Sequence, residues 1–125
     1  MITVCKTFEF SAAHNLPNHE GLCKNLHGHT YKLEVEVIGA VRKRGAEKGM
    51  IVDFGNLKKI INKVIIDKLD HSLLNKTFDN PTAEEMVQEM SFWIDNEFVA
   101  KETTFKLLRL RLWETPTSYA EWRPE

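Results

Sequence analysis

The stretch from Thr30 to Val37 alternates strictly between apolar side chains and polar or charged ones. Successive side chains of an extended strand point to opposite faces, so the pattern predicts a β-strand with one buried face. That face carries Tyr31, Leu33, Val35 and Val37. His27 and His29 precede the stretch and lie on the same face, because they are two residues apart. We therefore expect a strand over residues 27–38 that begins with two neighbouring imidazoles.

A second strand-like segment runs from Ile2 to His14 and also ends on a histidine. Its apolar face carries Phe8, Phe10 and Ala12, followed by His14 itself. Three neutral imidazoles at adjacent strand ends can fill three corners of a zinc tetrahedron and leave the fourth open for water or substrate. This pattern predicts a catalytic Zn²⁺ site at His14, His27 and His29. The alternative is that these side chains are ordinary hydrogen-bonded histidines.

Two amphipathic helices are expected in the middle of the chain. Asp53 can cap the first, whose apolar residues recur every three or four positions as far as Leu69. Thr82 and Glu85 form a capping-box pair at the start of the second. Both helices present one apolar stripe, which predicts that each packs on a common core.

Residues 105–114 and 118–123 have the composition of two further strands. The order β-β-α-α-β-β predicts an α+β fold, a four-stranded antiparallel sheet with both helices on one face. Long strands in a chain of 125 residues leave sheet edges that need a partner. We therefore expect a homo-oligomer that forms by edge pairing.

Size and composition limit the classes of function. A chain of 125 residues is expected to form one domain over residues 1–125, and its formal net charge of −1 gives no reason to expect a nucleic-acid or membrane partner. The N-terminus lacks the features of a signal peptide, and no apolar run approaches the ~20 residues of a membrane span. Two cysteines make a poor disulfide framework. A reducing, cytoplasmic location is the expectation.

Three further groups carry chemistry, each with a simpler alternative. Cys23 lies four residues before His27, where a bound dication would favour its thiolate as a base or nucleophile; it could also be a fourth zinc ligand or a small buried residue. Asp70 and His71 follow the first helix and form a candidate acid/base pair, although His71 could simply stabilise the helix end. Glu114 could grip an amidine-type group through two N–H···O bonds, or be a surface carboxylate. Its expected face also carries Leu108, Leu110 and Leu112.

Six short stretches appear together in an order and spacing that resemble the pterin synthase family, which includes 6-pyruvoyltetrahydropterin synthase. They run from near the N-terminus to the last turn, so the resemblance covers essentially the whole chain. The stretches are Phe10-Ser-Ala-Ala-His14, Cys23-x-x-x-His27-Gly-His29, Asp53-Phe54, Leu69-Asp70-His71-x-x-Leu74-Asn75, Asn80-Pro81-Thr82 and Glu114-Thr115.

The resemblance implies the tunnelling fold, in which such units join through their sheet edges into a barrel. Two rings commonly stack, which implies a trimer or a dimer of trimers with active sites between subunits. It assigns the zinc ligands to His14, His27 and His29. It also assigns the catalytic cysteine to Cys23, the acid/base pair to Asp70 and His71, and the anchor for the pterin's amino-pyrimidine edge to Glu114.

The branch of the family is indicated by the three residues Lys24 to Leu26, which separate the cysteine from His-Gly-His. This spacing is similar to that of the carboxytetrahydropterin-forming branch. The implied reaction converts 7,8-dihydroneopterin triphosphate to 6-carboxy-5,6,7,8-tetrahydropterin, acetaldehyde and triphosphate, for queuosine or another 7-deazaguanine. The pyruvoyl-forming branch usually has a longer insert, and a folate-linked branch has a glutamate here that this loop lacks. A non-catalytic zinc- or pterin-binding module is the alternative outside enzymes.

Overall fold

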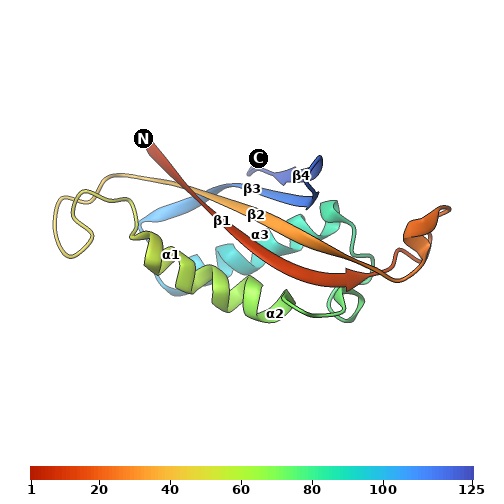
Figure 1. Ribbon diagram of the computed structural model, residues 1–125. Helices are drawn as coiled ribbons and strands as arrows, with labels where there is room; N and C mark the ends of the chain where they lie inside the picture. Colours follow the sequence, from red (N-terminus) through yellow and green to blue (C-terminus); the bar gives the residue numbers. More distant parts are fainter.

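One curved antiparallel sheet with the strand order β1-β2-β3-β4 organises the chain. The computed structural model describes residues 1–125, and Figure 1 shows the sheet with the helices along one side. The strands are β1 (Ile2–His14), β2 (His27–Gly39), β3 (Phe105–Thr115) and β4 (Ser118–Trp122). All four expected strands are therefore confirmed. The outer strands β1 and β4 form the two edges of the sheet.

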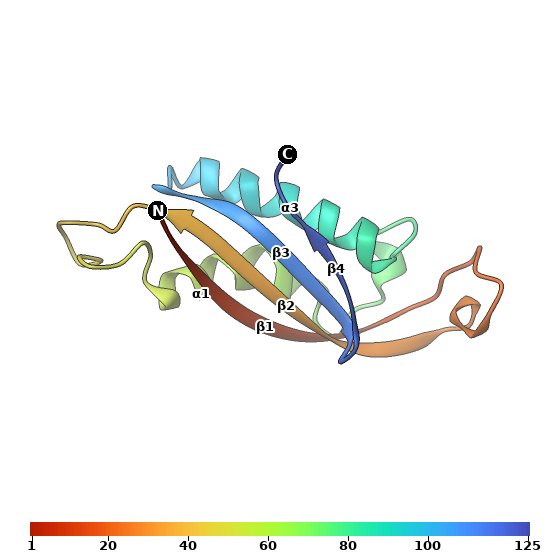
Figure 2. The same ribbon diagram turned by 90° about the horizontal axis from the view of Figure 1, so that it is seen from above.

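The two expected helices are also present and cover the same face of the sheet (Figures 1 and 2). The first consists of α1 (Phe54–Ile61), a π-helical segment η2 (Asn62–Ile66) and α2 (Asp67–Leu69); the second is α3 (Ala83–Ala100). Two short 3-10 turns complete the structure, η1 (Leu22–Lys24) and η3 (Leu74–Lys76). No helix is both long enough and apolar enough to cross a membrane.

The helix caps follow the sequence pattern with one difference. The Asp53 carboxylate accepts a hydrogen bond from the Gly55 amide at 2.7 Å, as expected of an N-cap. The Thr82 hydroxyl likewise accepts from the Glu85 amide at 3.2 Å. The reciprocal half of the capping box does not form, because the Thr82 amide donates instead to the Asn80 carbonyl at 2.8 Å.

The core lies between the sheet and the helices and contains a cluster of 26 buried apolar residues. The alternation of β2 accounts for its centre, since Tyr31, Leu33, Val35 and Val37 are each 0% exposed. These residues continue the face on which the strand begins with His27. The position of β2 in the middle of the core therefore also determines which way its histidines point.

The prediction of which face of β3 is buried is wrong for the first half of the strand. A register shift between Glu36 and Val37 pairs Val37 with Leu107, so that Leu107 enters the core while Leu108 is only half-buried. An extra residue at such a bulge moves the following side chains to the other face. Beyond the bulge, Leu110 and Leu112 are buried as expected.

Candidate functional site

The pairing of β1 with β2 brings three histidines together at one end of the sheet. His14 is directly opposite His27, and Ala12 is opposite His29. Because the alanine side chain is small, it leaves space beside the His29 imidazole. One ring nitrogen from each of His14, His27 and His29 lies within 4.8 Å of the other two. His14 is completely buried. The three residues predicted from the strand pattern therefore form a cluster that could hold a metal ion.

Hydrogen bonds determine which nitrogen of each ring faces this cluster. His14 Nδ1 is 2.9 Å from the Pro81 carbonyl, and His27 Nδ1 is 2.7 Å from the Asn25 carbonyl. A carbonyl can only accept, so both Nδ1 atoms donate and both Nε2 atoms keep a lone pair. Such outer hydrogen bonds are the usual way in which a metal-binding imidazole is oriented.

The lone pairs then face one another without a donor between them. The Nε2 atoms of His14 and His27 are 3.1 Å apart. His29 Nε2 is buried and has no hydrogen-bond partner. A buried acceptor without a partner is unfavourable, whereas a cation at the centre of the cluster would satisfy all three. The donor set therefore fits a metal ion bound by three neutral imidazoles.

The surroundings of His29 favour its neutral form. Burial lowers the pKa of His29, and the other two histidines act in the same direction, while Glu114 opposes the shift. A neutral ring is the form that binds a metal. Tyr31 lies beneath the cluster, with its ring centroid 5.6 Å from that of His29, and burial raises its pKa above the ordinary range. Sequence reasoning placed Tyr31 in the core but missed its contact with the site.

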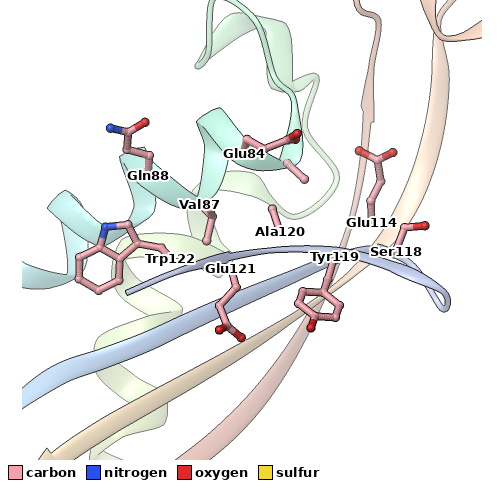
Figure 3. Close-up of a pocket in the computed structure, with 10 residues that line it drawn as sticks. Glu84, Val87, Gln88, Glu114, Ser118, Tyr119, Ala120, Glu121 and Trp122 are labelled. Atoms are coloured by element: carbon pink, nitrogen blue, oxygen red, sulfur yellow. The ribbon is translucent and has the colours of Figure 1, made fainter. Parts of the chain in front are cut away.

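Glu114 connects the cluster to a cavity. Its Oε1 atom is 3.7 Å from His29 Nε2. The same residue lines a cavity of about 510 Å³ between α3 and β4 (Figure 3). The helix contributes Ala83, Glu84, Val87 and Gln88, and the strand contributes Ser118 to Trp122. A ligand in this cavity could contact both the Glu114 carboxylate and an atom bound at the histidines.

The side chains of Asp70 and His71 lie in close contact immediately after α2. His71 Nδ1 is 3.1 Å from Asp70 Oδ1, and the same oxygen accepts from the Ser11 amide at 2.9 Å. The Ser11 amide is the main reason that the pKa of Asp70 is below its ordinary value, and His71 adds to the effect. His71 has a positive φ of 62° and its side chain is 83% exposed. Positive φ in a non-glycine residue is a strained arrangement that clusters at functional sites.

The pair does not belong to the histidine cluster, although it borders the same hollow as one of the three histidines. This shallow hollow of about 500 Å³ is lined by His71 and His29, with Ser11, Ala13 and Thr30 from the two strands. A single chain therefore places the acid/base candidate beside one residue of the metal candidate.

Cys23 is also separate from the cluster. It is half-buried in η1, within the loop 15–26 that projects past the end of the sheet (Figures 1 and 2). Its thiol is not part of the histidine group, so a single chain does not supply it as a fourth ligand. The flanking Leu22 and Leu26 are 85% and 67% exposed. Exposed apolar side chains of this kind are typical of a surface that another molecule covers.

Comparison with known proteins agrees with this geometry. The family model for 6-pyruvoyl tetrahydropterin synthase matches residues 3–125. The chain is 40% identical to the 6-carboxy-5,6,7,8-tetrahydropterin synthase of Haemophilus influenzae, over 98% of this chain and 99% of that protein. It is 42% identical to the dihydroneopterin monophosphate aldolase of Pyrococcus furiosus, over 84% of this chain and 82% of that protein.

A solved structure shares the whole architecture. The structure of Caenorhabditis elegans 6-pyruvoyl tetrahydropterin synthase matches with a TM-score of 0.82 and 26% identity, over 99% of this chain and 96% of that one. The family and the α+β tunnelling fold expected from the sequence are both confirmed. The chain therefore belongs to the 6-pyruvoyl tetrahydropterin synthase family of enzymes.

Proposed function

We propose that the protein is a zinc-dependent carbon–carbon lyase. In the proposed reaction, 7,8-dihydroneopterin triphosphate and water give 6-carboxy-5,6,7,8-tetrahydropterin, acetaldehyde and triphosphate. The observation that carries the proposal is the convergence of one ring nitrogen from each of three histidines beside Glu114 and a cavity. The near full-length match to the 6-carboxy-5,6,7,8-tetrahydropterin synthase of Haemophilus influenzae supports the choice of reaction.

The metal ligands in this proposal are His14, His27 and His29. Zinc fits three imidazole nitrogens with one open position, and when bound it would act as a Lewis acid toward a substrate oxygen. The Pro81 and Asn25 carbonyls hold two of the rings with Nε2 toward the ion. These contacts give the protein a preformed site rather than one that the ion must assemble.

Glu114 is proposed to bind the pterin ring. A carboxylate can accept two parallel hydrogen bonds from the amino-pyrimidine edge, which fixes the orientation as well as the position of the ring. Because Glu114 Oε1 is 3.7 Å from His29 Nε2, a pterin bound to Glu114 would have its side chain close to the metal position.

Cys23 is proposed to remove a proton from the substrate side chain, and His71, oriented by Asp70, to return one. Proton transfer by such groups requires contact with the reacting atoms. Cys23 is not part of the histidine cluster of its own chain, so the proposal requires a homo-oligomer with sites between subunits, a trimer or a dimer of trimers. The outer edges of β4 and of β1 before Ser11, and the exposed Leu22 and Leu26, support such an assembly.

The proposed cellular role is the synthesis of queuosine or another 7-deazaguanine in the cytoplasm. Two cysteines without a disulfide suit a reducing compartment, and the proposed mechanism needs Cys23 as a free thiol. The site as proposed uses residues from across 1–125, which we treat as one domain.

A second reaction is favoured by a specific observation. The dihydroneopterin monophosphate aldolase of Pyrococcus furiosus is as similar in sequence as the carboxytetrahydropterin synthase, although over a smaller share of the chain. Both reactions need an activated side chain and a proton acceptor. They differ in the phosphate group of the substrate and in the carbon fragment released.

Mass spectrometry of the products distinguishes these reactions. Reduced, zinc-loaded protein is incubated with dihydroneopterin triphosphate or monophosphate and an acetaldehyde trap. Carboxytetrahydropterin with trapped acetaldehyde, from the triphosphate alone, is the expected result. A pyruvoyl product without acetaldehyde, or turnover of the monophosphate alone, would contradict the proposed reaction. Unchanged substrates would favour a binding module.

A further inference from the structure

The segment that follows α2 runs along the outer edge of β1 and bonds to the end of that strand. The Ser11 amide donates to Asp70 Oδ1 at 2.9 Å, and the Ser11 carbonyl accepts from the His71 amide at 2.6 Å. Two residues farther along, the Ala13 amide donates to the Ser72 carbonyl at 3.0 Å. This segment therefore takes the place of a partner strand over the last part of β1.

Asn75 continues the same pattern with its side chain. The Asn15 amide donates to Asn75 Oδ1 at 3.0 Å, and Asn75 Nδ2 donates to the Asn15 carbonyl at 2.9 Å. A side-chain amide offers an acceptor and a donor in one plane, so it can satisfy both backbone groups of a neighbouring residue. Asn75 thus binds the residue that immediately follows the metal-ligand candidate His14.

The position of this segment is fixed by the core. Leu69 lies at its start and Leu74 near its end, and both are 0% exposed. Asn75 lies in η3 directly after Leu74, so its amide is held at a defined place beside β1. A displacement of the amide would require the removal of a buried leucine from the core, which is costly.

The bonded residues Ser11, Ala13 and Asn15 alternate with Ala12 and His14, which are buried on the other side of the strand. Because the side-chain period of a strand is two, the backbone on either side of His14 determines where its imidazole points. Ala13 is fixed by Ser72, and Asn15 is fixed by Asn75.

We propose that Asn75 is a positioning residue for His14, which holds the end of β1 so that His14 Nε2 faces the other two imidazoles. The inference rests on the proposed metal centre. Since the same segment carries Asp70 and His71, it also sets the acid/base pair at a fixed place relative to the histidines.

The test compares two variants that make the same chemical change. In Asn75→Asp, the side chain keeps an acceptor but loses the donor, and an oxygen then faces the Asn15 carbonyl. Asn56→Asp is the matched control. Asn56 lies near the start of α1, and its Nδ2 atom also donates one hydrogen bond, to Glu47 Oε1 at 3.0 Å. Asn75→Ala removes both hydrogen bonds and serves as the stronger variant where it folds.

Two readouts are needed. Zinc affinity is measured by competition with a chromophoric chelator, well below the melting temperature of each variant. We expect Asn75→Asp to bind zinc about tenfold more weakly than Asn56→Asp. This is the lower end of the loss in metal affinity that follows when a group that orients a metal ligand is mutated. In metal-free protein, hydrogen exchange of the Asn15 amide should be about tenfold faster in Asn75→Ala, which removes the acceptor of this amide, than in wild-type protein.

The outcomes separate this inference from the proposed function. If wild-type protein binds no zinc, the metal centre is wrong, and the exchange rates in metal-free protein still decide whether Asn75 holds the end of β1. If wild-type protein binds zinc and Asn75→Asp matches Asn56→Asp in affinity, Asn75 does not position His14. A lower melting temperature with unchanged zinc affinity would show a purely structural role and overturn the inference.

Discussion

The Nε2 atoms of His14 and His27 lie 3.1 Å apart, while the Nδ1 atom of each ring donates to a backbone carbonyl. Two lone pairs therefore meet at a distance that is unfavourable unless a proton or a metal ion lies between them. The nearby His29 Nε2 is also buried and has no partner, so a metal ion would stabilise it as well. This relationship is the physical reason for treating the strand ends as a metal centre.

Removal of one imidazole should abolish metal binding. We expect His27→Ala to retain less than about a tenth of the zinc of wild-type protein after dialysis, because two nitrogens cannot hold the tetrahedral ion. Metal analysis per chain checks this. His19→Ala is the control, since the His19 side chain lies in the loop and only accepts a hydrogen bond from the Gly21 amide. Equal zinc content in His27→Ala and His19→Ala would contradict the assignment.

The role of the thiol is tested separately from the metal. Cys23→Ala should keep its zinc and lose about 10²- to 10⁴-fold in turnover, the usual contribution of a general base. Cys5→Ala is the matched control, because Cys5 is exposed and lies on the opposite face of β1 from His14. Turnover of Cys23→Ala equal to that of Cys5→Ala would remove the thiol from the mechanism.

Glu114 should affect substrate binding more than metal binding. Glu114→Gln keeps the shape of the side chain but loses the charge that strengthens both hydrogen bonds to the pterin edge. We expect KM to rise about 10- to 100-fold, as the loss of a charged hydrogen bond implies. Steady-state kinetics and zinc content are measured together. Glu89→Gln, on the exposed side of α3 and outside this cavity, should leave KM unchanged.

A stability prediction follows from the charges on the outer face of the sheet. Arg123 and Arg111 hold the pKa of Glu121 to about 2, against an ordinary value of 4.5. Because the pKa is lower in the folded state, the stabilisation is fully present above pH 4.5 and is lost as the pH falls toward 2.

Urea unfolding of metal-free protein at one protein concentration checks this prediction. The difference in unfolding free energy between wild type and Glu121→Gln should shrink steadily as the pH is lowered from about 5 to about 3. Glu89→Gln forms the control, since Glu89 lies on the exposed side of α3. A difference that does not change with pH would show that Glu121 contributes nothing through its charge.

Local sequence patterns were sufficient for most of the fold and for the metal candidate. The alternation from Tyr31 to Val37 determines one buried face, and the same period places His27 and His29 on it. His14 is added by the equivalent pattern in β1. These features depend on neighbours within a few residues, and such neighbours are visible in the sequence.

Features that depend on distant partners could not be predicted in this way. The bulge that moves Leu107 into the core arises from the pairing of β3 with β2, which local periodicity does not describe. The hydrogen bonds of Asn75 join residues 60 positions apart. The resemblance marked Asn75 as part of a motif, but only the structure shows what its amide contacts. The arrangement of Cys23 with His71 that we propose requires a second copy of the chain, which local sequence patterns do not describe either.

The most direct measurement is a titration of metal-free protein with Zn²⁺, in which acetaldehyde release from dihydroneopterin triphosphate is followed at each addition. We expect no release without metal and a linear rise that ends at one zinc per chain. The variant His27→Ala should give no rise. Full acetaldehyde release by the metal-free protein, or a rise in His27→Ala equal to that of wild type, would contradict the central claim.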